Sequence, residues 1–591
     1  MSEEDCLFNP QILKEIIMIR KYSAPGIYKQ EIDVSDRVSP AGTSTGATVV
    51  RAKKGPINTP FLVTSDAEYI DYFGEPVNVS GTVDDSTIPE MDYGAYGALE
   101  FLKESSALYV VRDYASGDQY ASVLYDSNGS TSATSADGID CISDTTADNS
   151  TRIYTLDEAI PTGKSLMIGP LGPGSDGNNL AVTLESFHAS CDWINNYDTY
   201  TSATTAASHP IGSKVFKLQL YTKEDNESWT TLSFANYSAS PVETFYGTRT
   251  SMQDASKNQL SIADRVNGIS QYIYVVPGST DFATTGAATG CIPTSVTALQ
   301  GGAVVNGTNI GSTDGWSWFA NREDVDVNIM IVPDYTNSVK QYVANLAAAR
   351  QDCIAVGQTG SRTVVSPSSI IAMEDYGYNN PSYMSLYAGW GLMQDTYNDK
   401  TVWVPNSIFG AALMARTDRV ATVWDAPAGI NRGILPVLRQ YTNFTSTNVG
   451  VLYDSNINAA KKIKGIGNVM WGQKTAQLKA SALDRINVRR MLLYMEESIE
   501  QSMLTFLFQP NNSSTRLRVW SIIDGFVQTI QAGGGIDTYQ VVCDDSNNTA
   551  EVIDNNQLWV DTFVNPTKTI EYIQLRTIIT RSGVSFSEIS V

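Results

Sequence analysis

The spacing of apolar residues predicts alternating helices and strands on both sides of a long middle stretch. Near the N-terminus, Asp66–Phe73 and Tyr93–Lys103 have helical spacing, and Leu108–Arg112 is an apolar run of strand length. Further along, the continuous apolar run Val325–Pro333 precedes a helical pattern over Thr336–Arg350, and another short apolar run follows. This order is typical of a β-α-β unit, so we expect a parallel sheet that is buried between helices.

Long helical patterns dominate the C-terminal third of the chain. They predict helices over Ser407–Val420, Val488–Phe508 and Ser513–Ala532, the last of which ends at a run of glycines. Three further strands are expected at Thr538–Cys543, Leu558–Val564 and Thr569–Thr580.

Both ends of the chain carry segments with an extended pattern. An amphipathic helix is expected over Gln11–Lys21, followed by an exposed strand over Ile27–Val34, and Val584–Val591 is of the same extended kind. A strand that has no partner in its own chain is a template for pairing with the sheet edge of another chain. The residues expected to form such inter-subunit arms are Ile27, Tyr28, Ile32 and Val34 at the N-terminus and Val584, Phe586 and Ile589 at the C-terminus.

The middle of the chain differs in composition from both flanks. Between residues 120 and 300, clusters of Ser, Thr, Asn and Gly separate short strand-like runs such as Lys214–Tyr221. This stretch holds 8 Lys and Arg against 18 Asp and Glu, a balance of -10. We expect it to form inserted, solvent-facing β-rich units.

Composition and charge limit the classes of function. The 591 residues are 42% hydrophobic, which is enough apolar surface for roughly three or four domains. A formal net charge of -23 argues against a nucleic-acid coat, so no direct nucleic-acid partner is expected. No apolar stretch approaches the roughly 18 residues of a membrane span, and the opening residues lack the basic region of a secretory signal, so membrane insertion is not expected.

Few residues have the chemistry of an enzyme or a metal site. The six cysteines form no CxxC pair, and the two histidines are His188 and His209. The glycine motif Gly172–Gly177 precedes a strand-like run, Leu180–Leu184, where a dinucleotide site needs a helix. We therefore expect no catalytic residue, no metal and no cofactor.

One region is locally basic within the acidic chain. Residues 461–518 hold 10 Lys and Arg against 4 Asp and Glu, and the region opens with Lys461, Lys462 and Lys464. Two explanations are a solvated face that balances charge between neighbouring subunits and a docking surface for an acidic partner. Nucleic acid is a remote third.

A series of short motifs follows from residue 380 onwards. They are Ser382–Trp390, Val404–Gly410, Ala415–Arg419, Val423–Gly429, Leu452–Asp454, Ile457–Asn458, Val469–Thr475, Arg485–Arg490, Phe508–Asn512, Cys543–Asp544, Asn548–Thr549, Asn565–Pro566 and Ile570–Ile573. Ala24–Tyr28 and Ala52–Pro56 add two more near the N-terminus. In this order they resemble the contractile tail sheath proteins of bacteriophages. The resemblance extends over about 380–591, is weaker over 22–115 and 321–360, and is absent from most of 120–300.

The resemblance implies a structural subunit rather than an enzyme. Sheath proteins form a helical cylinder of many copies around an inner tail tube, between a baseplate and a tail terminator. In this family the terminal arms add strands to sheets of neighbouring subunits, and contraction drives the tube through the host envelope for genome ejection. The implied location is the virion, with assembly in the host bacterial cytoplasm. The basic residues Lys461, Lys462 and Lys464 are then candidates for facing the tube.

Two further functions compete with the phage sheath. One is the sheath of a related contractile injection system, of the R-type bacteriocin or type VI kind. The other is a subtilisin-like protease, which needs a Ser-His-Asp arrangement, although residues 321–591 contain no histidine. A surface or adhesin-type β-protein would suit the middle stretch but not the ordered motifs.

The expected fold class is a multidomain α/β and α+β protein. It combines an α/β, subtilisin-like sheath core and an α+β C-terminal domain with β-rich inserted outer domains and extended terminal arms. The expected parts are a helix and linking arm (1–34), the N-terminal part of the core (35–119), the inserted surface units (120–320), the α/β core (321–435), the C-terminal domain facing the tube (436–581) and a linking arm (582–591).

Overall fold

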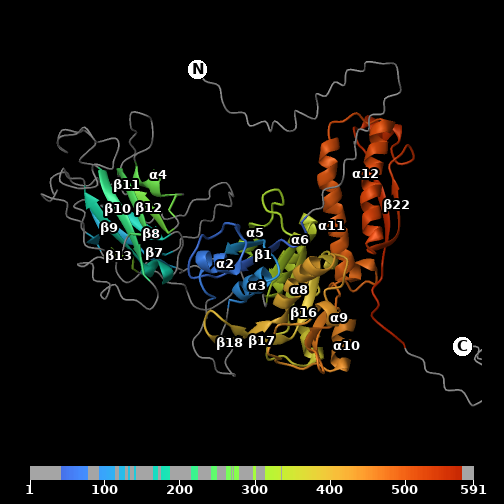
Figure 1. Ribbon diagram of the computed structural model, residues 1–591, viewed down its shortest axis with the longest axis horizontal. Coiled ribbons are helices and arrows are strands. Elements are labelled where there is room, and N and C mark those ends of the chain that lie inside the picture. The colour runs from blue at the N-terminus through green and yellow to red at the C-terminus, as the bar shows by residue number, and fades with distance from the viewer. Residues whose placement is uncertain are drawn as a thin grey trace, which may run out of the picture.

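The computed structural model describes residues 42–76, 92–113, 313–333 and 336–574, together with short segments between 119 and 300. The expected N-terminal helix, both terminal arms, His188 and His209 lie outside these residues. Figure 1 shows three parts: a β-rich unit on the left, a sheet with helices in the middle, and a pair of long helices at the upper right.

The middle part is built on an eight-stranded sheet with the strand order β2-β3-β1-β14-β15-β16-β20-β21. Its strands are β1 (Gly46–Val50), β2 (Phe61–Val63), β3 (Leu108–Arg112), β14 (Ile329–Val332), β15 (Ile354–Thr359), β16 (Met384–Ala388), β20 (Ile457–Ile463) and β21 (Gly467–Met470). The strands from β3 to β20 in this order are parallel, and β2 and β21 add antiparallel edges. The β-α-β unit expected around residue 340 is confirmed, because β14 and β15 pair in parallel on either side of α6 (Asn337–Arg350).

Helices cover both faces of this sheet. α3 (Tyr93–Leu102) and α8 (Asn406–Val420) lie on the face of Ile331, since a Cβ at Gly97 would be 3.2 Å from Ile331 Cγ2 and 3.7 Å from Ile408 Cγ1. α6 lies on the other face, where a Cβ at Gly357 would be 3.3 Å from Lys340 Cδ. Successive strand residues point to opposite faces, so the continuous apolar runs of these strands match a sheet covered on both sides.

Shorter elements surround the sheet. They are α2 (Asp66–Phe73), α5 (Asp314–Ser317), α7 (Pro367–Met373), α9 (Gly429–Arg432), α10 (Ser446–Asp454) and a three-stranded sheet of β17 (Trp390–Asp395), β18 (Lys400–Pro405) and β19 (Arg439–Gln440). The expected helix α2 has the bounds read from the sequence, because Ser65 Oγ accepts from the N–H of Glu68 at its start and Gly74 ends it at φ 80°.

The unit between residues 119 and 300 is antiparallel. Its two four-stranded sheets have the orders β11-β10-β9-β13 and β12-β8-β5-β6. The strands are β5 (Val123–Asp126), β6 (Thr131–Ser132), β8 (Lys164–Pro170), β9 (Leu180–Ser186), β10 (Val215–Thr222), β11 (Glu243–Thr248), β12 (Ile273–Pro277) and β13 (Thr297–Ala298), with β4 (Gln119–Tyr120) and β7 (Ile139–Asp140) as a separate pair. The helix α4 (Ile262–Val266) packs against β11 and β12. Residues of both sheets share one apolar core that includes Ile168, Val182 and Leu218.

The two ends of this unit meet. The N–H of Ser122 donates to the C=O of Gln300 at 2.9 Å. On the side of the core, a Cβ at Gly315 would lie 3.5 Å from the Cβ of Asp113. The chain therefore leaves the core and returns to it at neighbouring points, as expected of an inserted unit. The core itself resumes before residue 320, because Trp316 and Phe319 are buried in it.

The C-terminal unit consists of two long helices and a hairpin. α11 (Ile486–Met503) and α12 (Ser513–Ala532) pack together with β22 (Ile536–Val542) and β23 (Asp561–Pro566) around Met495, Ile523 and Val527. A short helix, α13 (Ala550–Asp554), lies between the two strands. The expected boundary at 436 falls within the region that builds the main sheet, since β20 pairs with β16.

Two elements of this unit differ from those expected. The helix that starts near 486 ends at Met503 rather than Phe508, and a 3-10 turn over Leu504–Phe506 follows it. Phe508 then has φ 65°, which turns the chain before Pro510 is reached. The strand expected from Thr569 is wrong over 569–574, where side-chain bonds attach the chain to the core in place of strand pairing.

Candidate functional site

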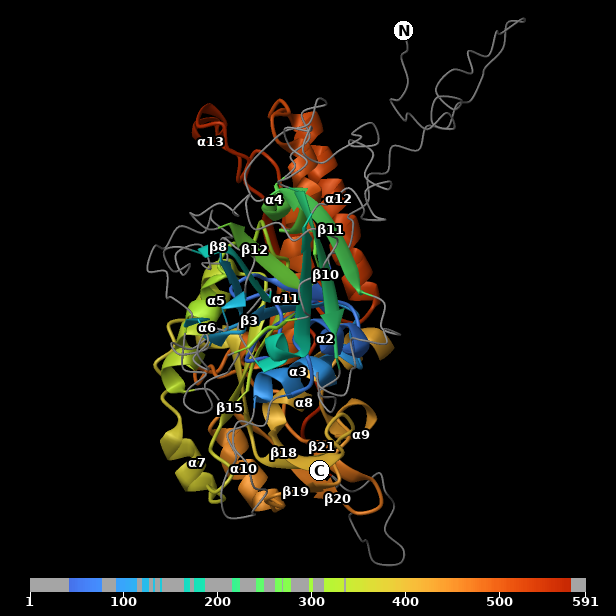
Figure 2. The ribbon, with the colours of Figure 1, turned by 90° about the vertical axis from the view of Figure 1, so that its left-hand side faces the viewer.

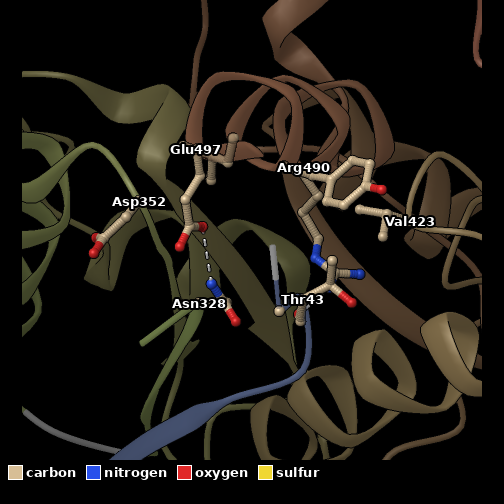
Figure 3. Close-up of a pocket in the computed structure, with 9 residues that line it drawn as sticks. Thr43, Asn328, Asp352, Val423, Arg490 and Glu497 are labelled. Carbon is tan, nitrogen blue, oxygen red and sulfur yellow. Dashed lines mark hydrogen bonds between the residues drawn. The ribbon is translucent and has the colours of Figure 1, made fainter. Parts of the chain in front are cut away.

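A small cavity lies where the main sheet meets α11. Figure 3 shows that Thr43 and Asn328 approach it from the sheet, and Arg490 and Glu497 from α11. Its volume is about 10 Å³. One water needs roughly 10–15 Å³, so the cavity is too small for a substrate. The residues that line this cavity come from remote parts of the chain and meet at this junction.

The first described residues of the chain are fastened at this junction by a buried ion pair. Arg490 donates to both carboxylate oxygens of Asp418, at 2.9 Å and 2.5 Å, and the two side chains are each only 4% exposed. The same guanidinium donates to the C=O of Thr43 at 3.0 Å, and Ser44 Oγ donates to Asp418 at 3.1 Å. We call this group the N-terminal clamp. Its paired geometry supplies the partners that a buried guanidinium requires.

The last described residues are fastened by a second, more exposed ion pair. Arg485 donates to Glu571 through Nε at 2.6 Å and through Nη2 at 2.9 Å, and Tyr453 Oη donates to Glu571 at 2.8 Å. The side chains of Arg485 and Glu571 are 24% and 17% exposed. Gln473 Nε2 donates to Thr569 Oγ1 at 2.7 Å. We call this group the C-terminal clamp.

Next to the N-terminal clamp, Glu497 holds a carboxyl group among other acids. Asn328 Nδ2 lies 3.4 Å from Glu497 Oε2, the contact drawn in Figure 3. Burial, together with the negative charges of Asp326 and Asp352, raises the pKa of Glu497 to about 7, while Arg322 opposes them. Near neutral pH this carboxyl is therefore partly protonated.

The expected basic segment forms a hairpin at the edge of the main sheet. Lys461 and Lys462 lie in β20, Lys464 lies in the turn, and Lys462 and Lys464 are exposed. Lys461 Nζ lies 5.3 Å from the centre of the Trp471 ring. Figure 2 shows β20 and β21 at the bottom of the molecule, whereas α11 and α12 rise above the sheet.

The local positive charge of residues 461–518 is dispersed in space. Arg485 and Arg490 belong to the two clamps, and Arg516 is paired with Asp545 at 2.6 Å. Arg489 is buried with its guanidinium 3.6 Å from the centre of the Tyr383 ring, and burial lowers its pKa. The basic surface is thus smaller than the sequence count indicated.

Exposed apolar side chains gather on the C-terminal unit and after it. They include Leu504, Leu507, Phe508, Leu517, Trp559, Phe563, Ile570, Tyr572 and Ile573, each at least 53% exposed. Within the described residues, no strand pairs with the outer edge of β22 or of β23. Exposed apolar residues beside open strand edges are typical of a surface that binds another protein.

The larger hollow on this unit does not have the character of an active site. A groove of about 310 Å³ lies between α12 and β22, lined by residues that include Arg516, Trp520 and Cys543. Burial raises the pKa of the Cys543 thiol, which keeps it protonated and unreactive. Within the described part of the chain, no helix is long and apolar enough to cross a membrane, and no group of three or more His, Cys, Asp or Glu side chains could hold a metal ion.

The C-terminal region matches a known family. Residues 479–580 match the phage tail sheath C-terminal domain. This match covers α11, α12, the β22–β23 hairpin and both arginines of the clamps, and it confirms the resemblance to contractile tail sheath proteins.

The curated proteins that are similar to this chain are described as tail sheath proteins. The chain is 34% identical over 299 residues to the tail sheath protein of Enterobacteria phage T4, which covers 47% of this chain and 45% of that protein. It is 36% identical over 231 residues to the tail sheath protein of Vibrio phage KVP40, covering 39% of this chain and 34% of that protein. The matches span half or less of the length of these relatives.

Solved structures of sheath proteins are also similar. The sheath tail protein from Desulfitobacterium hafniense has a TM-score of 0.49 at 10% identity, and 92% of this chain and all of that one are covered. The sheath of an extracellular contractile injection system in its contracted state has a TM-score of 0.38 at 23% identity, over 43% of this chain and 71% of that one.

Reasoning from the sequence missed the clamp residues. Asp418, Arg485 and Arg490 stood inside quoted motifs, but their partners Thr43 and Glu571 are remote along the chain. The available signal was a charged residue within a mostly apolar helical pattern, which demands a partner when it is buried.

Proposed function

We propose that this chain is the sheath subunit of a contractile phage tail, which polymerises helically around an inner tail tube. Its contraction would drive the tube through the host envelope during genome delivery. The observation that carries the proposal is the sheath domain at 479–580, together with relatives of 34% and 36% identity that are tail sheath proteins of phages. A sheath of another contractile injection system is the second candidate, which the phage origin of these relatives disfavours.

Strand addition provides a physical route to the polymer. The arms before residue 35 and after residue 581 have the pattern of unpaired strands, and the open edges of β22 and β23 are suitable acceptors. A contact between different surfaces of identical subunits does not close on itself, so it generates a helix. Ile27, Tyr28, Ile32, Val34, Val584, Phe586 and Ile589 remain the proposed arm contacts.

The proposed function is structural, and the main sheet is proposed to correspond to the family's subtilisin-like core in fold only. Both faces of its parallel sheet are covered by helices, and residues 321–591 contain no histidine to complete a serine protease triad. We further propose that the insert lies on the outside of the sheath, that the region 436–581 faces the tube, and that Lys461, Lys462 and Lys464 of the β20–β21 hairpin contribute to that contact. The proposed partners are copies of this chain, the tube protein, the baseplate and the tail terminator, within a virion assembled in the host cytoplasm.

Removal of the arms tests this function. Chains lacking residues 1–34 or 582–591 should remain folded monomers that fail to form tubes, because the described core residues lie between Ala47 and Leu493. Circular dichroism would report folding, and electron microscopy would report assembly beside the full chain. Ordered helical tubes from either truncated chain would overturn the arm assignment, and full-length protein that forms no tubes would count against a sheath.

A further inference from the structure

The two clamps involve the same helix. Arg485 is the residue that precedes α11, and Arg490 lies in its second turn. Five residues of helix rise about 7.5 Å, so the anchoring points of the two ends of the described chain lie close together. Thr43 and Glu571, which are far apart in the sequence, are thus fastened to one short stretch of chain.

This stretch is itself held firmly in the core. The N–H of Ile486 donates to the C=O of Gln473 at 2.9 Å, and Asn487 Nδ2 donates to the C=O of Trp424 at 3.0 Å. The side chain of Ile486 is fully buried. The start of α11 is therefore a rigid support that does not depend on either terminal segment.

The two clamps differ in exposure. The N-terminal clamp places Arg490 and Asp418 at 4% exposure each, where salt screens little. The C-terminal clamp places Arg485 and Glu571 at 24% and 17%, within reach of solvent ions. Around Glu571, Ile570, Tyr572 and Ile573 are at least 77% exposed. The ion pair, the Tyr453 and Thr569 bonds, and the bond from the N–H of Thr567 to the C=O of Gly535 are the described contacts that retain this segment.

We propose that the start of α11 holds the described ends of both terminal segments. Arg490 holds the N-terminal segment permanently, and Arg485 holds the C-terminal segment releasably. The purpose of this arrangement rests on the proposed sheath function. In a sheath, the start of α11 would couple the two terminal arms mechanically. A force applied to the N-terminal segment would be transmitted to the core through the buried clamp. The C-terminal segment could detach at Glu571 without unfolding the domain.

The test is hydrogen exchange of the full-length monomer, read by mass spectrometry over residues 42–50 and 567–573. Glu571→Gln should accelerate exchange of the Thr567 amide, whose N–H donates to the C=O of Gly535 at 3.1 Å, by about tenfold, the effect of losing one charge-assisted pair, and should leave 42–50 unchanged. Lys568→Gln is the matched control, because it changes the charge of an exposed residue in the same segment outside the clamp. Unchanged exchange in Glu571→Gln, or equal acceleration in Lys568→Gln, would overturn the clamp.

Salt separates the two clamps without a substitution. Near 1 M salt the screening length falls to about 3 Å, so exchange in 567–573 should accelerate while 42–50 stays protected. Equal responses of both segments would overturn the proposed asymmetry.

Assembly then tests the purpose of the clamp. Glu571→Gln should need a higher protein concentration than wild type or Lys568→Gln to form tubes, and equal concentrations would overturn a role in assembly. Because the exchange result is obtained on monomers, it stands even if wild-type protein forms no tubes, an outcome that counts against the sheath function alone.

Discussion

The main sheet and the inserted unit are built in opposite ways. The main sheet collects strands from positions as distant as 46 and 463, mostly in parallel, and buries charge pairs such as Lys340 with Glu374. The insert pairs its strands in antiparallel fashion within residues 119–300 around an apolar core. The main sheet is assembled from strands that span most of the chain, whereas the inserted unit is formed by one continuous segment whose two ends are adjacent.

This difference explains where the family motifs fall. The motif residues Asn406, Ser407 and Asn458 are fully buried in the main sheet region, and Asn458 bonds to Leu386 and Lys474 on neighbouring segments. The insert shows little resemblance to the family and has an apolar core of its own. Residues of the main sheet region contact segments from many parts of the chain, and each contact restricts which residue can stand there. The inserted unit has its own apolar core, so its residues need to fit only that core.

The largest expected effect is the loss of a buried charge pair in the core. Lys340 Nζ donates to Glu374 at 2.7 Å, and the side chains are 3% and 0% exposed. Lys340→Ala leaves the carboxylate buried without its cation, so it should lower the free energy of unfolding of the core by about 3–5 kcal/mol. Urea unfolding, followed by region-resolved hydrogen exchange, would measure it.

The matched control is Lys53→Ala, which removes a partly exposed pair with Glu75 at 3.5 Å. It should cost less than about 1 kcal/mol. The insert should unfold at the same urea concentration in both variants. A parallel loss of stability in the insert would show that the two regions form one cooperative unit.

A smaller effect concerns pH and should be confined to the core. The raised pKa of Glu497, about 7 against an ordinary 4.5, means that the folded state retains a proton that the unfolded chain has lost. Stability should therefore fall as pH rises from about 4.5 to about 7, and Glu497→Gln should reduce that fall. Thermal unfolding across this range would measure it.

Glu500→Gln serves as the control on the same helix, since Glu500 is exposed and pairs with Arg322 at the surface. It should leave the slope of stability against pH in place. If Glu497→Gln also retained the full dependence of stability on pH, the Glu497 carboxyl would not be the cause of that dependence.

The smallest expected effect is the most informative about the two regions. Replacing residues 114–312 by a short Gly/Ser linker from Asp113 to Thr313 should barely change the melting temperature of the core, because these ends already lie together. Calorimetry should show the loss of one transition and retention of the other. Aggregation or loss of the core transition would mean that the insert supports the core.

Much of the local structure could be predicted from the sequence. α2 and α12 have the bounds expected from the sequence, and in the structure Ser65 and Asn512 cap them by accepting from first-turn N–H groups. The ordered motifs indicated the sheath family before any geometry was known. By contrast, a strand was expected from Thr569 because its apolar pattern resembles that of β23, and only the contacts of Thr569 and Glu571 with the core explain why the chain does not pair there.

By itself, the sequence determined the positions of most helices and strands, the foreign character of the middle stretch and the relationship to tail sheath proteins, because these depend on neighbouring residues and on short motifs. Only the tertiary structure decided that β1 lies between β3 and β14, that the positive charge of residues 461–518 is dispersed, and that Arg485 and Arg490 hold opposite ends of the described chain. The physical reason is that ion pairs and sheet order are contacts between remote segments, and their energies depend on burial and distance, which arise only when the whole chain is folded.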